Sequence, residues 1–299
     1  MIILSEVFMG QTYDYYYVGD RSLLDGDVGR SQPTLIAFSK KKNSPDEKVA
    51  PHIHSYTELF YFESGSGTFE YDGGKTTIHP HDVVLVNSNT LHRQYSDNST
   101  PLTYYCFAID DISIPGNPQN CISDKPFHIF SAKEQDNCFY NNINALITEF
   151  HSRKFGWFNK AYCLFNQILI DAMRAFHTDY PTREQNDSIK SDYADKIKDY
   201  LVTNYSKPIN LDTLTSLSLV SKSHMLRLFK NKFGIPPMQY LNLIRLEQAK
   251  TLLGKTSLNV TEIAVKVGFD NPVYFTEMFS KYLGVSPSVY RKTVKRRNI

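Results

Sequence analysis

The first part of the chain alternates between apolar and polar residues over short stretches. Six such stretches after Ser31 are rich in Thr, Val, Tyr and Phe, and Gly, Asp, Asn or Pro residues separate them. This pattern is typical of strands joined by tight turns, and YDGGK at residues 71–75 favours a hairpin. Because no helical pattern interrupts the strands, we expect a β-sandwich or jelly-roll barrel over residues 1–132. The six stretches read PTLIAFSK, TELFYFES, GTFEYDGG, KTTIHPHD, DVVLVNSN and TYYCFAID.

The spacing of the apolar residues changes after residue 133. Apolar residues recur at helical spacing over residues 139–150, SRKFGW interrupts the pattern, and it resumes over residues 161–176. We therefore predict a helical hairpin over residues 133–179. The stretch HTDYPTREQNDSIKSD that follows is polar and has no apolar period, so we place a flexible linker at residues 180–190.

The last third of the chain contains one pattern twice. Phe229, Gly234, Pro237 and Tyr240 recur about fifty residues later as Phe, Gly, Pro and Tyr at positions 279, 284, 287 and 290. In each copy, apolar residues at spacings of three and four indicate two short helices. The apolar residues of segment 238–253 predict one helix that connects the two copies.

Capping signals mark the second helix of each copy. Ser221 and Asn271 suit the N-cap, Pro272 suits the first helical position, and Gly268 permits a turn before it. Two helices joined by a tight turn form a helix-turn-helix unit. A connecting helix about 24 Å long could hold the two second helices about one DNA turn apart, so we expect both to enter the major groove of one duplex.

The charge is divided unevenly between the two parts. Residues 1–187 hold 15 Lys and Arg against 23 Asp and Glu, whereas residues 188–299 hold 18 against 8. The net charges of −8 and +10 suit a polyanionic partner for the C-terminal part. The four cysteines form no CxxC pair and predict buried, reduced thiols. No apolar run approaches the roughly 18 residues of a membrane span, so we expect a cytoplasmic protein.

Two motifs in the second copy carry a family resemblance. IAVKVGFDNPVYF at residues 263–275 and GVSPSVYR at residues 284–291, with the first copy before them, resemble the AraC/XylS family of bacterial transcription regulators. The resemblance covers roughly residues 190–293. It implies a double helix-turn-helix DNA-binding domain, which we place at residues 191–299, with double-stranded DNA as its partner.

The resemblance also implies which side chains meet DNA. We expect Arg227 to contact guanine or phosphate and Lys230 to contact phosphate. Glu277 stands where the family commonly has arginine, and its carboxylate could accept from cytosine N4 or pair with Lys281. Leu219 stands in the first turn where the family often has glycine. The predicted DNA-binding residues are Ser221, Lys222, Ser223, His224, Leu226, Arg227, Lys230, Asn271, Val273, Thr276 and Glu277.

A histidine pattern in the barrel segment resembles the cupin fold. PHIHSYTELFYFESG at residues 51–65 and a later His92 match the two His, one Glu and final His of metal-binding cupins. On a strand, His52 and His54 would share one face. Three interpretations stay open: a small-molecule pocket without metal, a site for Zn, Fe, Ni or Mn, and structural histidines. We favour the pocket and expect no cofactor. Its predicted ligand-binding residues are His52, His54, Tyr56, Glu58 and His92, and the metal alternative uses His52, His54, Glu58 and His92.

These patterns together predict an α+β two-domain protein: a cupin-like jelly-roll barrel with a helical hairpin, then an all-α domain with two helix-turn-helix units. By the resemblance, its function is ligand-responsive transcription regulation. The effector is a sugar or related metabolite, activation is the commoner outcome, the hairpin forms a homodimer, and RNA polymerase is a contact. We expect no catalytic residues. The alternative is a metal-binding cupin enzyme, an isomerase or dioxygenase, or a metal sensor fused to a DNA-binding domain.

Overall fold

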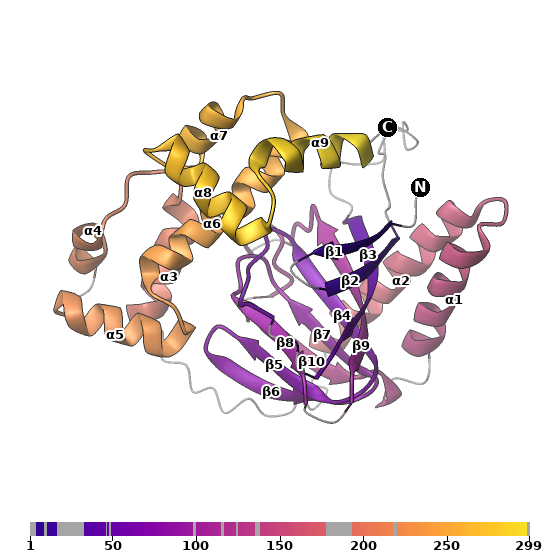
Figure 1. Cartoon of the computed structure of the whole chain (residues 1–299). Helices are drawn as coiled ribbons and strands as arrows, with labels where there is room; N and C mark the ends of the chain where they lie inside the picture. Colours follow the sequence, from indigo (N-terminus) through magenta and orange to yellow (C-terminus); the bar gives the residue numbers. More distant parts are fainter. Residues whose placement is uncertain are drawn as a thin grey trace.

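The computed structural model describes most of the chain. It covers residues 4–8, 11–16, 33–45, 47, 49–97, 100–114, 117–123, 125–134, 138–177, 193–217 and 220–297. A body of strands lies between a pair of helices, α1 and α2, at one end and the helices α3 to α9 at the other (Figure 1). The predicted two-domain α+β fold is confirmed. The proposed linker at residues 180–190 lies outside the described residues.

The N-terminal domain is built from two antiparallel sheets. The larger sheet has the strand order β1-β2-β3-β9-β4-β7-β10, and the smaller has the order β6-β5-β8. All six predicted stretches form strands, β3 to β7 and β9, while β1, β2, β8 and β10 were not predicted. The strands are β1 (Leu4–Phe8), β2 (Gln11–Tyr16), β3 (Thr34–Asn43), β4 (Thr57–Ser64), β5 (Gly67–Tyr71), β6 (Gly74–Ile78), β7 (Asp82–Val86), β8 (His92–Ser96), β9 (Leu102–Asp110) and β10 (Phe127–Ser131).

Strand β4 explains how the sheets pack. Its side chains alternate between two apolar layers, because successive residues of a strand point to opposite faces. Phe60 and Phe62 belong to the core between the two sheets, together with Phe69 and Tyr104. Tyr61, on the other face, belongs to the core under the helical hairpin. The space between the sheets is therefore filled largely by aromatic rings.

The predicted helical hairpin covers the outer face of the larger sheet. After a short 3-10 turn, η2 (Ala132–Glu134), helices α1 (Cys138–Ser152) and α2 (Trp157–His177) pack on each other. Their buried faces, with Phe150 and Phe165, join the core of β3, β4 and β9. Cys163 on α2 is exposed, so the prediction that the cysteines are buried was wrong for this residue.

The helical domain contains the predicted repeat. Helices α4 and α5 form one helix-turn-helix unit, α7 and α8 form the other, and α6 connects them. Helices α3 and α9, which flank the repeat, were not predicted. The bounds are α3 (Tyr193–Asn204), α4 (Leu211–Ser216), α5 (Lys222–Phe233), α6 (Pro237–Lys255), α7 (Val260–Lys266), α8 (Pro272–Leu283) and α9 (Pro287–Arg297).

The predicted N-cap residues, Ser221 and Asn271, begin the second helix of each helix-turn-helix unit, α5 and α8. The Ser221 side chain accepts a hydrogen bond from the His224 backbone N–H at 3.4 Å, and the Asn271 side chain accepts one from Val273 at 2.8 Å. Pro272 is the first residue of α8. In the first turn, Leu219 lies outside the described residues. Among the described residues, none of the helices combines the length and apolar character that crossing a bilayer would need.

Candidate functional site

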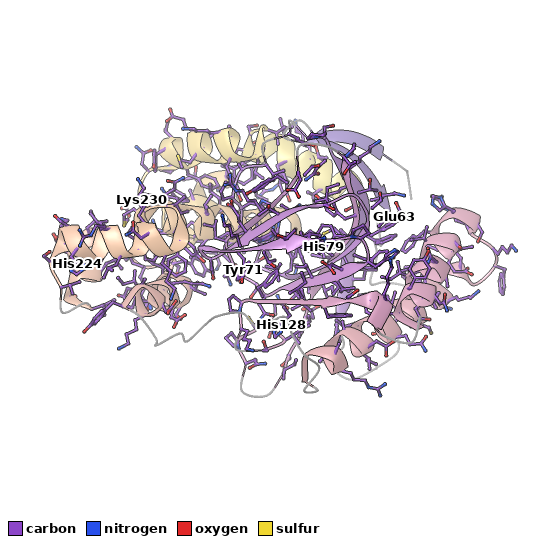
Figure 2. The ribbon with its side chains drawn as sticks, turned by 90° about the horizontal axis from the view of Figure 1, so that it is seen from below. Glu63, Tyr71, His79, His128, His224 and Lys230 are labelled. Atoms are coloured by element: carbon purple, nitrogen blue, oxygen red, sulfur yellow. The ribbon has the colours of Figure 1, made fainter. Side chains whose placement is uncertain are left out.

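The second helix of each helix-turn-helix unit presents polar side chains to the surface. On α5, Lys222, Arg227 and Lys230 are exposed, because Met225, Phe229 and Phe233 occupy the buried face. Figure 2 shows His224 and Lys230 on α5, at the end of the molecule away from α1 and α2. These cations stand where a phosphate backbone could reach them.

Not every predicted DNA-binding residue is equally free. Ser221 and Asn271 use their side chains as helix caps, and Leu226 is half-buried against the domain core. Thr276 donates its hydroxyl to the Pro272 carbonyl at 2.9 Å. Val273 and Glu277 are exposed on α8.

Tyr274 is an exposed aromatic residue that the prediction missed. Its side chain is 45% exposed beside Val273, and its hydroxyl accepts a hydrogen bond from Asn242 of α6 at 3.4 Å. The sequence could have predicted this exposure, because Tyr274 lies in the first turn of α8 and outside the buried stripe of Phe275 and Phe279. Such a face suits contact with thymine methyl groups.

The connecting helix α6 is buried over much of its length, and one of its faces contacts the barrel. Tyr240 donates its hydroxyl to the Asn89 carbonyl at 2.7 Å, two turns from Glu247. Further along the helix, Lys255 pairs with Asp110 at 2.9 Å. Spacings of seven and eight residues place Tyr240, Glu247 and Lys255 on one side of a helix. Helix α6 therefore contacts the barrel from its first turn to its last.

The histidine pattern of the barrel converges on one carboxylate. His92 starts β8, Glu58 lies in β4, and the segment with His52 runs beside β8, where His52 and His92 exchange two backbone hydrogen bonds of 2.9 Å. Glu58 Oε2 lies 2.9 Å from His92 Nε2 and 3.5 Å from His54 Nε2. One ligand atom from each of the four residues lies within 4.8 Å of the others.

Carbonyl groups fix the orientation of two imidazole rings. The Nδ1 atom of His52 lies 3.0 Å from the Ala50 carbonyl, and that of His92 lies 2.9 Å from the Thr90 carbonyl. A carbonyl only accepts, so Nδ1 carries the proton in both rings and Nε2 faces the cluster.

Burial and mutual charge set the protonation of the cluster. Burial, reinforced by the neighbouring His92 and His54, lowers the pKa of His52 well below its usual value. Burial acts to raise the pKa of Glu58, but His54 and His92 outweigh it and hold this pKa well below the usual range. The site thus combines a neutral imidazole with an ionised carboxylate, a donor set that fits divalent transition metals.

Two aromatic rings pack against the imidazoles. Tyr56 stacks on His54 with ring centroids 4.7 Å apart, and Phe69 stacks on His92 at 5.8 Å. The predicted ligand-binding residues His52, His54, Tyr56, Glu58 and His92 therefore lie together. What the sequence did not predict is Glu247, whose side chain on α6 accepts from His54 Nδ1 at 3.2 Å.

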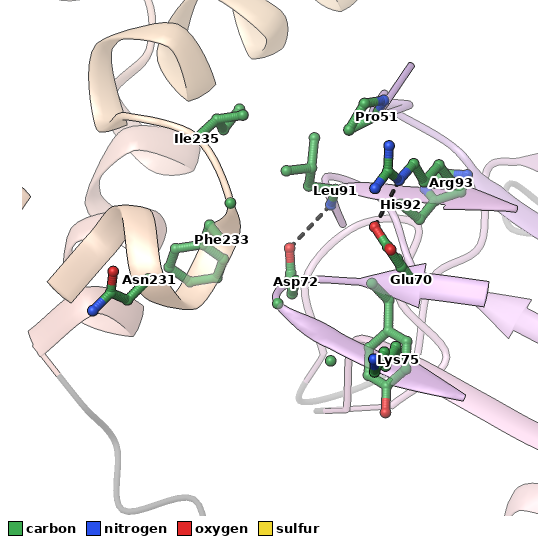
Figure 3. Close-up of a pocket in the computed structure, with 14 residues that line it drawn as sticks. Pro51, Glu70, Asp72, Lys75, Leu91, His92, Arg93, Asn231, Phe233 and Ile235 are labelled. Carbon is green, nitrogen blue, oxygen red and sulfur yellow. Dashed lines mark hydrogen bonds and ion pairs between the residues drawn. The ribbon is translucent and has the colours of Figure 1, made fainter. Parts of the chain in front are cut away.

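A cleft of about 500 Å³ lies beside the cluster, between the two domains. The barrel contributes the β5–β6 hairpin and the start of β8, and the end of α5 forms the opposite wall (Figure 3). Within it, Arg93 pairs with Glu70 at 2.6 Å, and Phe233 faces across from the helix side. Of the five predicted ligand-binding residues, His92 lines this cleft.

Comparisons with known proteins match both domains. Residues 40–162 match the AraC-like ligand binding domain, and residues 217–293 match a helix-turn-helix domain. An uncharacterized HTH-type transcriptional regulator of Escherichia coli (strain K12), YdiP, is 27% identical over 90% of this chain and 89% of its own length.

Two further relatives are named for sugar operons. The lactose operon transcription activator of Staphylococcus xylosus is 28% identical over 78% of this chain and 82% of its own length. The raffinose operon transcriptional regulatory protein RafR of Pediococcus pentosaceus is 25% identical over 79% of this chain and 84% of its own length. With both domains matched in the order that the fold shows, the chain belongs to the AraC/XylS family and is a DNA-binding transcription regulator.

Proposed function

We propose that this regulator responds to a sugar or a related small metabolite in the cytoplasm and activates transcription. The observation that carries the proposal is the cleft between the domains, because a ligand there would touch the barrel and the first helix-turn-helix unit together. The Glu70–Arg93 pair offers acceptors and donors to hydroxyl groups, and Phe233 offers a ring face. The sugar-operon names of two relatives support the ligand class.

An effector in this cleft would act by shifting a population. A ligand that binds one arrangement of the two domains better than another favours that arrangement, and typical coupling free energies are about 1–3 kcal/mol. DNA affinity would change by roughly 5- to 150-fold, which is enough to regulate a promoter. His92 lines the cleft, and we propose that His52, His54, Tyr56 and Glu58, which lie together with it, complete the effector region. Because the relatives are regulators, we propose no catalytic role for them.

The paired units would bind adjacent stretches of one DNA duplex. Arg227 and Lys230 on α5 and Val273 and Glu277 on α8 are the proposed contacts, with the capped helix N-termini turned toward the phosphates. We also propose a homodimer through the α1–α2 hairpin, with RNA polymerase as the partner in activation. Exposed apolar side chains on this hairpin, Tyr140, Phe155 and Ile170, support the dimer.

The test is binding of the purified chain to the DNA upstream of its own gene, at one fixed salt concentration, with a panel of sugars. We expect one sugar to change the affinity at least five-fold. Arg227→Ala should weaken binding by roughly 5- to 150-fold, the equivalent of about 1–3 kcal/mol. Lys125→Ala removes the same charge from an exposed barrel loop and should leave affinity unchanged. If no sugar alters affinity, the effector class is wrong; if Arg227→Ala binds like the parent, Arg227 is no DNA contact.

A further inference from the structure

We propose that Glu247 of the DNA-binding domain is the outer partner that couples the docking of the two domains to a divalent transition-metal ion held by the cupin-type set His52, His54, Glu58 and His92. The metal site goes beyond the sugar response proposed above and does not depend on it. Its regulatory consequence rests on the DNA-binding function.

The donor atoms are already close to a metal geometry. Zn²⁺ takes tetrahedral nitrogen and oxygen ligands at about 2.0–2.2 Å, which puts the donors about 3.4 Å from one another. The four donor atoms lie within 4.8 Å of one another, and the distance from Glu58 Oε2 to His54 Nε2 is 3.5 Å. Side-chain shifts on the order of 1 Å would close the site. Four protein ligands leave no open position on a tetrahedral ion, so the site suits sensing better than catalysis.

Each imidazole has an outer hydrogen-bond partner of the kind that metal-bound histidines use. The Nδ1 atoms of His52 and His92 face backbone carbonyls, whereas that of His54 faces a carboxylate oxygen of Glu247. Such partners hold the tautomer that leaves Nε2 free for the metal. Two of the partners come from the barrel, but the third comes from α6, 193 residues away along the chain.

The carboxylate of Glu247 is buried and held in place by hydrogen bonds from its own helix. It is 1% exposed, and Lys250 Nζ donates to both of its carboxylate oxygens, at 2.9 and 2.7 Å. One turn later, Thr251 lies 3.4 Å from Ser55 of the barrel, Oγ1 to Oγ. Movement of α6 away from the barrel would therefore remove the outer partner of His54.

Metal occupancy and domain docking should favour each other. A divalent ion on His54 Nε2 makes its Nδ1–H a stronger donor, which strengthens the bond to Glu247 and holds α6 on the barrel. The docked arrangement in turn binds the ion more tightly, because coupling between two equilibria is reciprocal. Since α6 joins the two helix-turn-helix units, the ion would fix the position of both relative to the barrel.

The first experiment is calorimetric titration of the metal-free full chain with Zn²⁺. We expect one equivalent to bind. Glu58→Gln removes a direct ligand and should abolish the high-affinity binding, whereas Glu247→Gln should weaken it by about 10- to 100-fold. Glu63→Gln is the matched control, since Glu63 lies on the same strand as Glu58 but on its opposite, half-exposed face. Co²⁺ in place of Zn²⁺ should give the intense visible absorption of a tetrahedral site, which a merely structural role for Glu58 would not produce.

The outcomes separate the parts of the proposal. Less than a tenth of an equivalent of Zn²⁺ on the parent chain, or unchanged affinity in Glu58→Gln, would overturn the metal site. Parent-like affinity in Glu247→Gln would overturn the coupling. The second experiment compares DNA affinity with Zn²⁺ and with a chelator: we expect at least a five-fold change for the parent chain and none for Glu247→Gln. Because the calorimetry needs neither DNA nor sugar, failure of the sugar response would leave its result intact.

Discussion

At the scale of single residues, Gly268 makes the turn between α7 and α8, in a left-handed conformation with a φ of 95°. A Cβ at this position would lie 2.7 Å from the Tyr205 carbonyl and 2.9 Å from Arg245 Nη2. That guanidinium is itself engaged, because its Nε donates to Tyr205 O at 2.8 Å and its Nη2 donates to Lys207 O at 2.9 Å. Gly268→Ala should therefore lower the free energy of unfolding by about 2–4 kcal/mol, from backbone strain and displacement of Arg245. Urea unfolding followed by far-UV circular dichroism measures this.

Gly284 provides the control for the strain alone. It ends α8 with a φ of 73°, and a Cβ there would meet no atom within 4 Å. Gly284→Ala should cost only about 1–2 kcal/mol, the strain of a left-handed alanine. Equal losses in the two variants would show that the packing of Tyr205 and Arg245 adds nothing to the turn.

The residues that the sequence predicted are those with local partners. Ser221 and Asn271 cap helices through backbone groups two or three residues away, so a short pattern was enough to find them. Glu247 lies three residues after Ile244, on the buried face of α6. From the sequence alone, a charged residue at this position is expected to be exposed to solvent. Its partner Lys250 is local, but its partner His54 is distant in the chain, so the sequence does not show that this carboxylate contacts the barrel.

At the scale of elements, α2 has an outer face that its own domain leaves uncovered. Phe165, Ile168 and Leu169 are buried against the barrel, whereas Ile170 is 48% exposed and lies on the same side as the exposed Cys163. If this face forms the proposed dimer, a charge at its centre must be desolvated when the copies meet. Ile170→Glu should weaken self-association at least ten-fold in sedimentation equilibrium.

The matched variant for this prediction adds the same charge elsewhere. Thr203→Glu places a carboxylate on the exposed side of α3, in the other domain, and should leave the dimer unchanged. An unchanged dimer in Ile170→Glu would place the interface away from this face of α2.

Strands were predictable where buried positions carry apolar side chains. The stretches that became β3 to β7 and β9 alternate or run apolar, and turn residues bound them. Strand β8 was missed because its buried positions, His92, Gln94 and Ser96, are polar. They are buried because they find partners across the barrel, as when Gln94 donates to the Tyr104 hydroxyl at 2.6 Å. Hydropathy cannot detect a strand whose inward face is held by hydrogen bonds.

At the scale of the whole molecule, the two domains meet through a mixed interface. Ile53 and Leu91 of the barrel join the apolar core of α3, α5 and α6. Polar contacts surround them, including an ion pair between Asp72 and Lys198. The charge asymmetry of the sequence suggested two separate units, but it held no signal for their docking, because each of these contacts joins residues more than one hundred positions apart.

The tip of the β5–β6 hairpin offers a way to undock the domains without touching either core. Gly73 has a φ of 85°, and a Cβ there would lie 1.3 Å from the backbone carbonyl oxygen of Lys232 in α5. A helix backbone cannot yield locally, so Gly73→Ala should separate the hairpin from α5 and displace the helical domain. Small-angle scattering should record a larger radius of gyration. Because Glu247 then leaves His54, Zn²⁺ affinity should fall by about the 10- to 100-fold expected for Glu247→Gln.

Gly156, in the turn between α1 and α2, separates this effect from simple backbone strain. Its φ is 77°, and a Cβ there would meet no atom within 4 Å, so Gly156→Ala carries the left-handed cost without a clash. It should keep the parent radius of gyration and Zn²⁺ affinity. If Gly73→Ala expands the molecule while its Zn²⁺ affinity stays at the parent value, the metal and the docking of α6 are independent. If both change together, the DNA-binding domain completes the metal site of the barrel. The bound ion then controls the position of helices α5 and α8 relative to the barrel.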